Sequence, residues 1–474
     1  MSVARKIFLN TSWQVVLRLL EVALGVVILG LITRLLGQDN YGYFTTVTAW
    51  VQLFFTVADF GLYLTLLREL GAKPSGEHSS IVNSIFTLRL ITALIMLGLC
   101  VVAVQLTNYP DAIKAGVWAL SWSYFFVSLT SVLTAVFQRE LAMPKIAWAN
   151  VINKIIYFGL LVYIAGWLNH SLQAVLWASS LASALYFILT VILLRPYVML
   201  AWQIDLSYWL KVLKKTWPLA ITIALNLIYF KLDTIFLSWF EPSASVGLYG
   251  AAYRVLEMLT TFPHMFMGLI FPIMTAAWVA GNLIELQKLW QRAFDFFALL
   301  TLPLIAGAIV VGRPLMSLVA GPDFEAAGDI LKILMLATAI IFFGTLYTYL
   351  VLIFDKQKTM IPYFALTAII SVIGYWWLIP LYSYWAAAWV TVAVELLIVI
   401  FAWIIVRKQL AYQPDLSVLF KSALASLLMA GFIWLLPEMS VLIKITLAAG
   451  IYFIFIIFFR AVRISELKHL TNKN

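Results

Sequence analysis

Ten charged residues interrupt long apolar runs of this chain. The basic members of the set are Arg18, Arg89, Lys154, Lys231 and Arg254. The acidic members are Glu21, Asp59, Asp233, Glu257 and Glu395. Guanidinium and ammonium groups bind phosphate, whereas carboxylates in apolar surroundings often serve as ion sites in transporters. The two sets therefore predict a site for an anionic group, with Asp59, Asp233, Glu257 and Glu395 as candidates for ion coupling.

The spacing of these residues separates paired charges from unpaired ones. Arg18 and Glu21, like Arg254 and Glu257, are three residues apart and can neutralise each other on one helix face. For both pairs, structural pairing and contact with a substrate stay open as alternatives. Lys231 and Asp233 are two residues apart and point to different sides of a helix, so they are not natural partners.

Arg89 and Lys154 have no acidic residue at helical spacing on their own apolar runs. Each lies about 10–12 Å along a helix from the nearer end of its run, at 1.5 Å per residue. A charge at the centre of a membrane helix costs roughly 2.5–3.5 kcal/mol, so these side chains must face protein or water. The surroundings of these basic residues are cationic only if the carboxylates are paired or protonated. For the carboxylates, salt bridges across the protein interior are the alternative to ion coupling.

The composition gives the class of protein. The chain has 474 residues, of which 64% are hydrophobic and 11% charged. Soluble domains average about 45–50% apolar and about 25% charged residues, so this is an integral membrane protein. The net charge of +10 is explained by basic loops between membrane spans rather than by a nucleic-acid partner. The single cysteine, Cys100, forms no intramolecular disulfide.

Fourteen segments are long and apolar enough to span a membrane as helices. They are 13–36, 42–67, 81–106, 115–137, 147–168, 172–194, 217–240, 246–278, 290–311, 330–354, 360–382, 385–406, 418–436 and 441–459. With the N-terminus inside, 21 of the 31 basic residues fall in cytoplasmic segments and five in outer ones. This asymmetry predicts an all-α multi-pass protein with both termini in the cytoplasm.

The span pattern indicates an internal duplication. Segment 217–240 follows the first six spans, and Gly42 and Gly247 align at an offset of 205 residues. Residues 1–208 and 209–412 are therefore predicted to form two parallel six-helix repeats, with residues 413–474 adding a helix pair and a tail. Parallel repeats around a central cavity are typical of transporters that work by alternating access.

Short motifs add a family resemblance. They are Arg34-Leu35-Leu36-Gly37, Tyr41-Gly42, Ala58-Asp59-Phe60-Gly61-Leu62, Arg68-Glu69, Asp233, Val246-Gly247-Leu248-Tyr249 with Ala252 and Arg254, and Gly321-Pro322-Asp323-Phe324 before Leu331. In these residues the chain resembles polysaccharide-transporter flippases of the multidrug/oligosaccharidyl-lipid/polysaccharide exporter superfamily, and most of all their O-antigen (Wzx-type) branch.

The resemblance implies a function. Such a protein moves an undecaprenyl-pyrophosphate-linked oligosaccharide from the inner to the outer leaflet of the bacterial inner membrane, for O-antigen or exopolysaccharide biosynthesis. Membrane lipids and polysaccharide polymerase machinery are the implied partners, and H⁺ or Na⁺ is the implied coupling ion. On this interpretation Arg89 and Lys154 hold the pyrophosphate first, Lys231 and Arg254 receive it, and Arg18 is a further substrate-binding candidate.

Three alternatives stay open. Within the superfamily the chain could be a lipid II flippase or a multidrug exporter. From another class, it could be a membrane glycosyltransferase or ligase acting on the same lipid. The outer loop with Asp323, Glu325 and Asp329 is the only place where catalytic carboxylates would be sought. The sequence has no metal-ligand spacing, nucleotide-binding loop or nucleophile triad, so we expect neither an enzyme nor a bound metal or cofactor.

Overall fold

The computed structural model describes the backbone of residues 3–59, 61–73, 75–167 and 171–461. It describes their side chains except at 3–15, 58–59, 75, 215, 218–224 and 226–229. Every regular element within these residues is a helix, as the long apolar runs predict. The chain divides into two compact units, Met1–Gly247 and Leu248–Asn474. The predicted boundaries at residues 208 and 412 stay a prediction.

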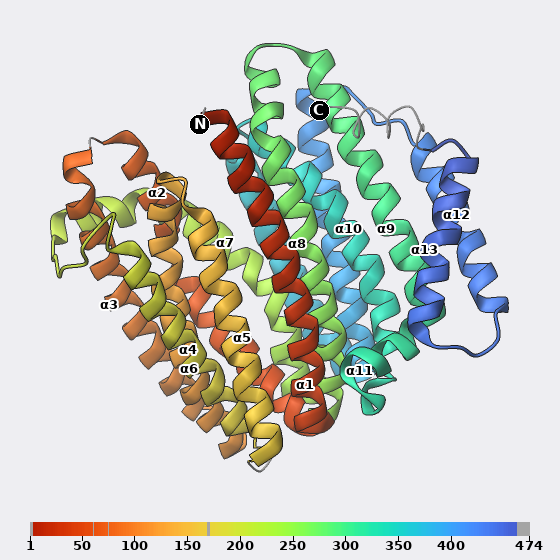
Figure 1. Ribbon diagram of the computed structural model, residues 1–474, viewed down its shortest axis with the longest axis horizontal. Helices are drawn as coiled ribbons and strands as arrows, with labels where there is room; N and C mark the ends of the chain where they lie inside the picture. The colour runs from red at the N-terminus through yellow and green to blue at the C-terminus, as the bar shows by residue number, and fades with distance from the viewer. Residues whose placement is uncertain (1–2, 60, 74, 168–170, 462–474) are drawn as a thin grey trace. The chain divides into compact units, whose positions relative to one another are not determined.

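The first unit contains seven α-helices, one 3₁₀ turn and the beginning of an eighth helix (Figure 1). They are α1 (Val3–Asp59), α2 (Leu62–Ala72), η1 (Ser75–Glu77), α3 (His78–Gln105), α4 (Asp111–Arg139), α5 (Met143–Trp167), α6 (Leu172–Leu194), α7 (Leu206–Phe240) and the start of α8 (Ser243–Val279). Asp205 caps α7 by accepting a hydrogen bond from the Tyr208 amide at 2.9 Å.

Helix α1 consists of two segments that meet at Gly37. As one straight helix its 57 residues would extend about 85 Å, far more than a bilayer core of about 30 Å. Gly37 has φ 66° and ψ −178°, a conformation that glycine adopts without steric cost. Figure 1 shows the chain descending from the N-terminus to the α1 label and rising again to α2. The predicted spans 13–36 and 42–67 correspond to these two segments.

The second unit contains the rest of α8 and five further α-helices. They are α9 (Leu283–Ala320), α10 (Ala327–Ile353) after the 3₁₀ turn η2 (Pro322–Phe324), α11 (Gln357–Gln409), α12 (Ser417–Leu435) and α13 (Val441–Phe458). Helix α9 begins seven residues before the predicted span. Asn282 accepts a hydrogen bond from the Glu285 amide at 3.1 Å and so starts the helix in polar sequence, ahead of the apolar run.

Helix α11 is a hairpin of two antiparallel segments. Ser383, at φ 55° and ψ −141°, separates them. The rings of Tyr363 and Phe401 stack with centroids 4.6 Å apart, and a Cβ on Gly374 would lie 3.2 Å from Val390 Cγ2. In each pair the two residues lie at nearly equal sequence distances on either side of Ser383, as a hairpin requires. The segments correspond to the predicted spans 360–382 and 385–406.

Eleven helices within the described residues are long and apolar enough to cross a membrane. Two of them, α1 and α11, each contain two predicted spans, and α7 corresponds to a further one. The chain is therefore an all-α, multi-pass membrane protein. The exact number of fourteen spans stays a prediction.

Two glycines let α1 and the start of α8 approach with their backbones in contact, within the first unit. A Cβ on Gly42 would lie 1.8 Å from the Ser243 carbonyl oxygen, and a Cβ on Gly247 would lie 2.3 Å from that of Gln38. Ser243 Oγ also donates a hydrogen bond to Asp39 Oδ1 at 2.6 Å. The contact is reciprocal at an offset of 205 residues, in agreement with the sequence alignment of the two glycines.

Candidate functional site

Arg89 lies in the wall of a cavity in the first unit. The cavity has a volume of about 330 Å³ and is lined by Phe55, Thr56, Tyr63, Arg89, Tyr124, Val127, Ser128 and Ser131. Only 2% of the surface of Arg89, on α3, is exposed. The site therefore combines one buried guanidinium group with several hydroxyl groups from α1, α2 and α4. Such a set suits a ligand that carries both an anionic group and hydroxyl groups, such as a phosphate with attached sugars.

Helix α4 supplies the hydroxyl face of this cavity. Tyr124, Ser128 and Ser131 are spaced i, i+4 and i+7, so they lie on one side of the helix. The Ser128 hydroxyl is buried and makes no hydrogen bond within the described part of the chain. Buried hydroxyl groups are nearly always hydrogen-bonded, so this one is available for a bound group. The i, i+4, i+7 spacing is the sequence signal that the predictions missed.

A second polar cluster joins α1 to α5 around Glu21. The Glu21 carboxylate is buried and forms an ion pair with Arg18 at 2.7 Å, as their spacing allows. Lys154 Nζ, on α5, donates a hydrogen bond to the Glu21 backbone oxygen at 2.7 Å. The structure thus brings the predicted residues Arg18 and Lys154 to the same turn of α1. Lys154 is not among the residues described as lining the Arg89 cavity.

Helix α7 holds two further predicted residues inside the first unit. Lys231 is 9% exposed and Asp233 is fully buried. Asp233 Oδ1 accepts a hydrogen bond from the Thr234 amide at 2.5 Å. The burial of both charges supports their interpretation as residues that face protein or water rather than lipid.

In the second unit the predicted charges fall into two environments. Arg254 and Glu257 form the ion pair that their spacing allows, at 2.7 Å on a partly exposed face of α8. Glu395, in the second segment of α11, is 4% exposed, and its Oε1 makes no hydrogen bond within the residues described.

The Asp59 side chain lies outside the described residues, so its role as an ion-coupling candidate stays a prediction.

One of the three carboxylates in the predicted outer loop is engaged in ion pairs. Asp329 contacts both Arg313 and Lys332 at 2.6 Å. These contacts join the end of α9 to the start of α10, which gives Asp329 a structural role. No group of three or more His, Cys, Asp or Glu side chains that could hold a metal ion occurs among the residues described.

Comparisons with known proteins agree with this fold. A family model described as "Polysaccharide biosynthesis protein" matches residues 7–278, more than half of the chain. A Shigella dysenteriae protein described as an O-antigen transporter is 22% identical over 379 residues, which cover 78% of this chain and 92% of that protein.

Two solved structures share the fold. The inward closed conformation of the lipid II flippase MurJ superimposes with a TM-score of 0.77 at 15% identity, over 94% of this chain and 98% of that one. An inward-facing multidrug resistance MATE transporter of the MOP superfamily superimposes with a TM-score of 0.62 at 13% identity, over 82% and 92%.

The all-helical fold, its apolar helices and these structural likenesses define a multi-pass membrane protein with the transporter fold of the MOP superfamily. The chain belongs to the polysaccharide biosynthesis protein family, whose model covers the Arg89 cavity and the Glu21 cluster. The resemblance to O-antigen flippases found in the short motifs is confirmed.

Proposed function

We propose that the protein moves an undecaprenyl-pyrophosphate-linked oligosaccharide from the inner to the outer leaflet of a bacterial cytoplasmic membrane by alternating access. The observation that carries this proposal is a cavity wall that contains both the buried Arg89 and the Ser128 hydroxyl, which makes no hydrogen bond within the described residues. A guanidinium group binds two phosphate oxygens with parallel hydrogen bonds, and hydroxyl groups pair with sugars or phosphate.

The sign of the charge favours this substrate over a cationic drug. A bound cation would be repelled by the Arg89 guanidinium group, and no carboxylate is among the residues described as lining this cavity. A lipid II flippase would need the same phosphate chemistry. The site therefore favours a phosphate-containing headgroup, and the identity of the glycan is determined by the transport assay. The relatives named above are transporters, which supports a transport function rather than glycosyl transfer.

The remaining cationic candidates extend the path of the headgroup. Lys154 and Arg18 lie at the Glu21 turn of α1, and Lys231 lies on α7. In the proposed cycle Arg89 and Lys154 hold the pyrophosphate in the inward-open state, and Lys231 and Arg254 receive it as the repeats rock. The protein works in the cytoplasmic membrane with both termini inside and delivers glycan to the polymerase machinery.

Glu395 is the proposed proton-coupling residue, and Glu395→Gln is expected to uncouple transport. A buried carboxylate is costly when charged, and Glu395 Oε1 makes no hydrogen bond within the described residues, so Glu395 suits a group that takes up and releases a proton during the cycle. The amide has the same shape but cannot titrate. Transport into vesicles should then lose its acceleration by a pH gradient while the amount of folded protein stays unchanged.

The matched control for this substitution is Glu438→Gln, at an exposed position. It should respond to a pH gradient as the parent does. Acceleration by a pH gradient that persists in Glu395→Gln would remove this residue from the coupling step. Acceleration by a Na⁺ gradient alone would assign the coupling ion to Na⁺ and contradict the proton role of Glu395.

The function itself is tested in a bacterium that lacks its own O-antigen flippase. Expression of this protein, together with the glycan it serves, should restore surface polysaccharide. Without it, complete lipid-linked oligosaccharide should accumulate in the inner leaflet. A glycosyltransferase would instead leave an incomplete glycan, and accumulation of a truncated product would therefore contradict the proposal.

A further inference from the structure

The segment between α6 and α7 lies across α3 as an extended strap, defined here as residues 195–205. Four α3 side chains, Ser80, Asn83, Ser84 and Thr87, are spaced i, i+3, i+4 and i+7 and so share one face of the helix. Asn83 Nδ2 donates a hydrogen bond to the Met199 carbonyl oxygen at 3.3 Å, and Asn83 Oδ1 accepts one from the Ala201 amide at 3.1 Å. Thr87 Oγ1 accepts a hydrogen bond from the Gln203 amide at 3.2 Å, and Gln203 Nε2 donates to Ser80 Oγ at 2.6 Å. Ser84 Oγ accepts a hydrogen bond from the Trp209 indole N–H at 3.0 Å.

The exposed side of the strap is apolar, although the strap lies outside the predicted membrane spans. Met199 and Trp202 are 79% and 77% exposed, and Ile204, Leu206 and Leu210 continue the exposed apolar surface into α7. The opposite side is buried in the core of the first unit through Val198 and Trp209. A tryptophan and large aliphatic side chains exposed at the end of a membrane helix bundle are typical of a segment in the lipid interface.

A preformed apolar pocket lies beneath the strap. Its volume is about 290 Å³, and the residues described as lining it are apolar or aromatic except Thr87. The wall contains Phe86, Phe126 and Phe187, whose rings pack together at centroid distances of 6.4 Å for Phe86–Phe187 and 5.9 Å for Phe126–Phe187. Leu200 and Trp202 of the strap complete it. The hydrogen bonds to α3 hold the strap in place, so the pocket does not depend on a ligand for its shape.

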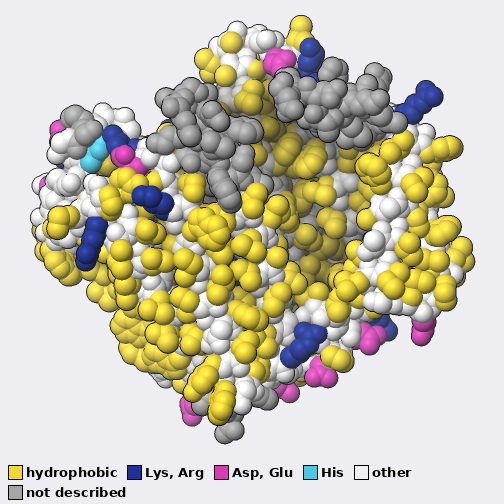
Figure 2. Space-filling view, in the orientation of Figure 1, with side chains coloured by type: hydrophobic (Ala, Val, Ile, Leu, Met, Phe, Trp, Pro, Cys, Tyr) yellow, Lys and Arg dark blue, Asp and Glu magenta, His cyan; other side chains and the backbone are white. Residues whose placement is uncertain are grey.

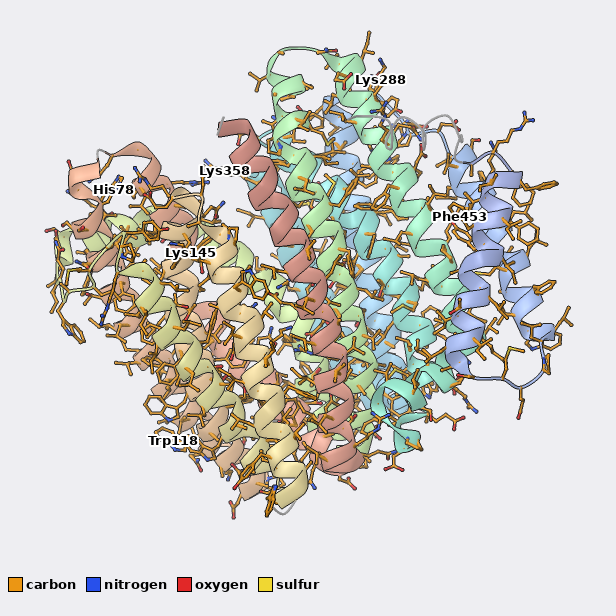
Figure 3. The ribbon with its side chains drawn as sticks, viewed as in Figure 1. His78, Trp118, Lys145, Lys288, Lys358 and Phe453 are labelled. Carbon is orange, nitrogen blue, oxygen red and sulfur yellow. The ribbon has the colours of Figure 1, made fainter. Side chains whose placement is uncertain are left out.

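Basic residues flank the strap. Lys145 Nζ lies 2.9 Å from Tyr197 Oη and 5.0 Å from the centre of its ring. Arg195, Lys211 and Lys214 are exposed on the strap and on the first turns of α7. The nearby Asp205 carboxylate is engaged in capping α7. Figure 3 places Lys145 and His78 toward the same end of the first unit, with Trp118 toward the other, and Figure 2 shows basic side chains gathered at that end.

We propose that this pocket binds an acyl chain of an anionic phospholipid from the leaflet in which the strap lies, predicted to be the cytoplasmic one. The apolar pocket accepts the chain, the exposed apolar strap residues enter the interface, and the flanking basic residues attract the phosphate headgroup. The site is separate from the transport cavity: none of the residues described as lining the Arg89 cavity lines this pocket.

The test uses the purified full chain in vesicles that contain a phosphatidylglycerol with a photoreactive group on its acyl chain. Peptides containing residues 83–92 or 195–206 should be labelled at least about fivefold more than with a phosphatidylcholine probe, the factor that one basic residue contributes near an anionic surface. Ala201→Trp fills the pocket from an exposed position outside any helix and should reduce this labelling to background. Ala280→Trp, also exposed and in a turn, should leave it unchanged.

A second variant keeps the test valid if Ala201→Trp does not fold. Lys145→Gln combined with Lys211→Gln should reduce the preference for phosphatidylglycerol, and the exposed Lys408→Gln should not. Equal labelling by the two phospholipid probes would overturn the proposal. So would labelling of these peptides by a photoreactive polyprenyl phosphate but not by phosphatidylglycerol, since the occupant would then be the prenyl chain of a carrier lipid.

Discussion

Arg89→Ala is expected to abolish glycan export while the amount of protein in the membrane stays near normal. Arg89 is 2% exposed and lines the cavity, so loss of its guanidinium group removes charge from the proposed binding site. A hydrogen bond to a charged group contributes about 1.5–3 kcal/mol. Loss of one such contact weakens pyrophosphate binding roughly 10- to 150-fold. Export is measured as surface polysaccharide in cells, alongside protein abundance in the membrane fraction.

Two comparisons separate a binding role from a structural one. Arg89→Lys keeps the charge but loses the planar fork, so it should retain part of the activity. Arg292→Ala removes an exposed arginine from α9 and should export normally. If Arg89 serves only to hold the helices together, Arg89→Ala leaves other buried groups uncompensated, and abundance and export should fall in parallel.

Gly42→Ala is expected to destabilise the first unit strongly. The new Cβ would lie 1.8 Å from the Ser243 carbonyl oxygen and 2.6 Å from its carbon, both backbone atoms that cannot move aside alone. Overpacking costs typically about 1–3 kcal/mol, and a clash with backbone belongs at the upper end of that range or beyond it. The change should lower the thermal unfolding midpoint of the purified protein in detergent.

Gly98→Ala is the matched control for this clash. Gly98 is also helical, and a Cβ there would meet no atom within 4 Å. Alanine in a helix is favoured over glycine by roughly 0.5–1 kcal/mol, so this variant should be as stable as the parent or slightly more. An unfolding midpoint of Gly42→Ala equal to that of Gly98→Ala would show that the two backbones do not lie in contact.

The sequence predicted those parts of the fold and site that depend on local spacing. Apolar runs of about 20 residues located the helices. The i, i+3 spacing of Arg18 with Glu21 and of Arg254 with Glu257 gave ion pairing as one of two alternatives, and both ion pairs form. The end of the first span at Leu36, next to Gly37, matches the turn in α1. Each of these features follows from residues within a few turns of one another.

Contacts between distant elements could not be predicted in this way. Lys154 donates to a backbone oxygen on α1, 133 residues away, and no side-chain pattern marks that acceptor. Ser383 adopts a positive φ, which sequence patterns assign to glycine or asparagine rather than serine. The hydroxyl face of α4 had a readable signal, but the approach of that face to Arg89 depends on how α3 and α4 pack.

The most direct test of the central claim is transbilayer movement in vesicles that contain only the purified protein and an undecaprenyl-pyrophosphate-linked oligosaccharide. The glycan begins in the inner leaflet, and its arrival outside is detected by an added glycosidase or lectin. The account predicts that the oligosaccharide reaches the outer leaflet chemically unchanged, that inorganic pyrophosphate inside the vesicles slows its movement, and that Arg89→Ala stops it. Movement that proceeds equally in Arg89→Ala vesicles, or a glycan that emerges with altered composition, would contradict the account.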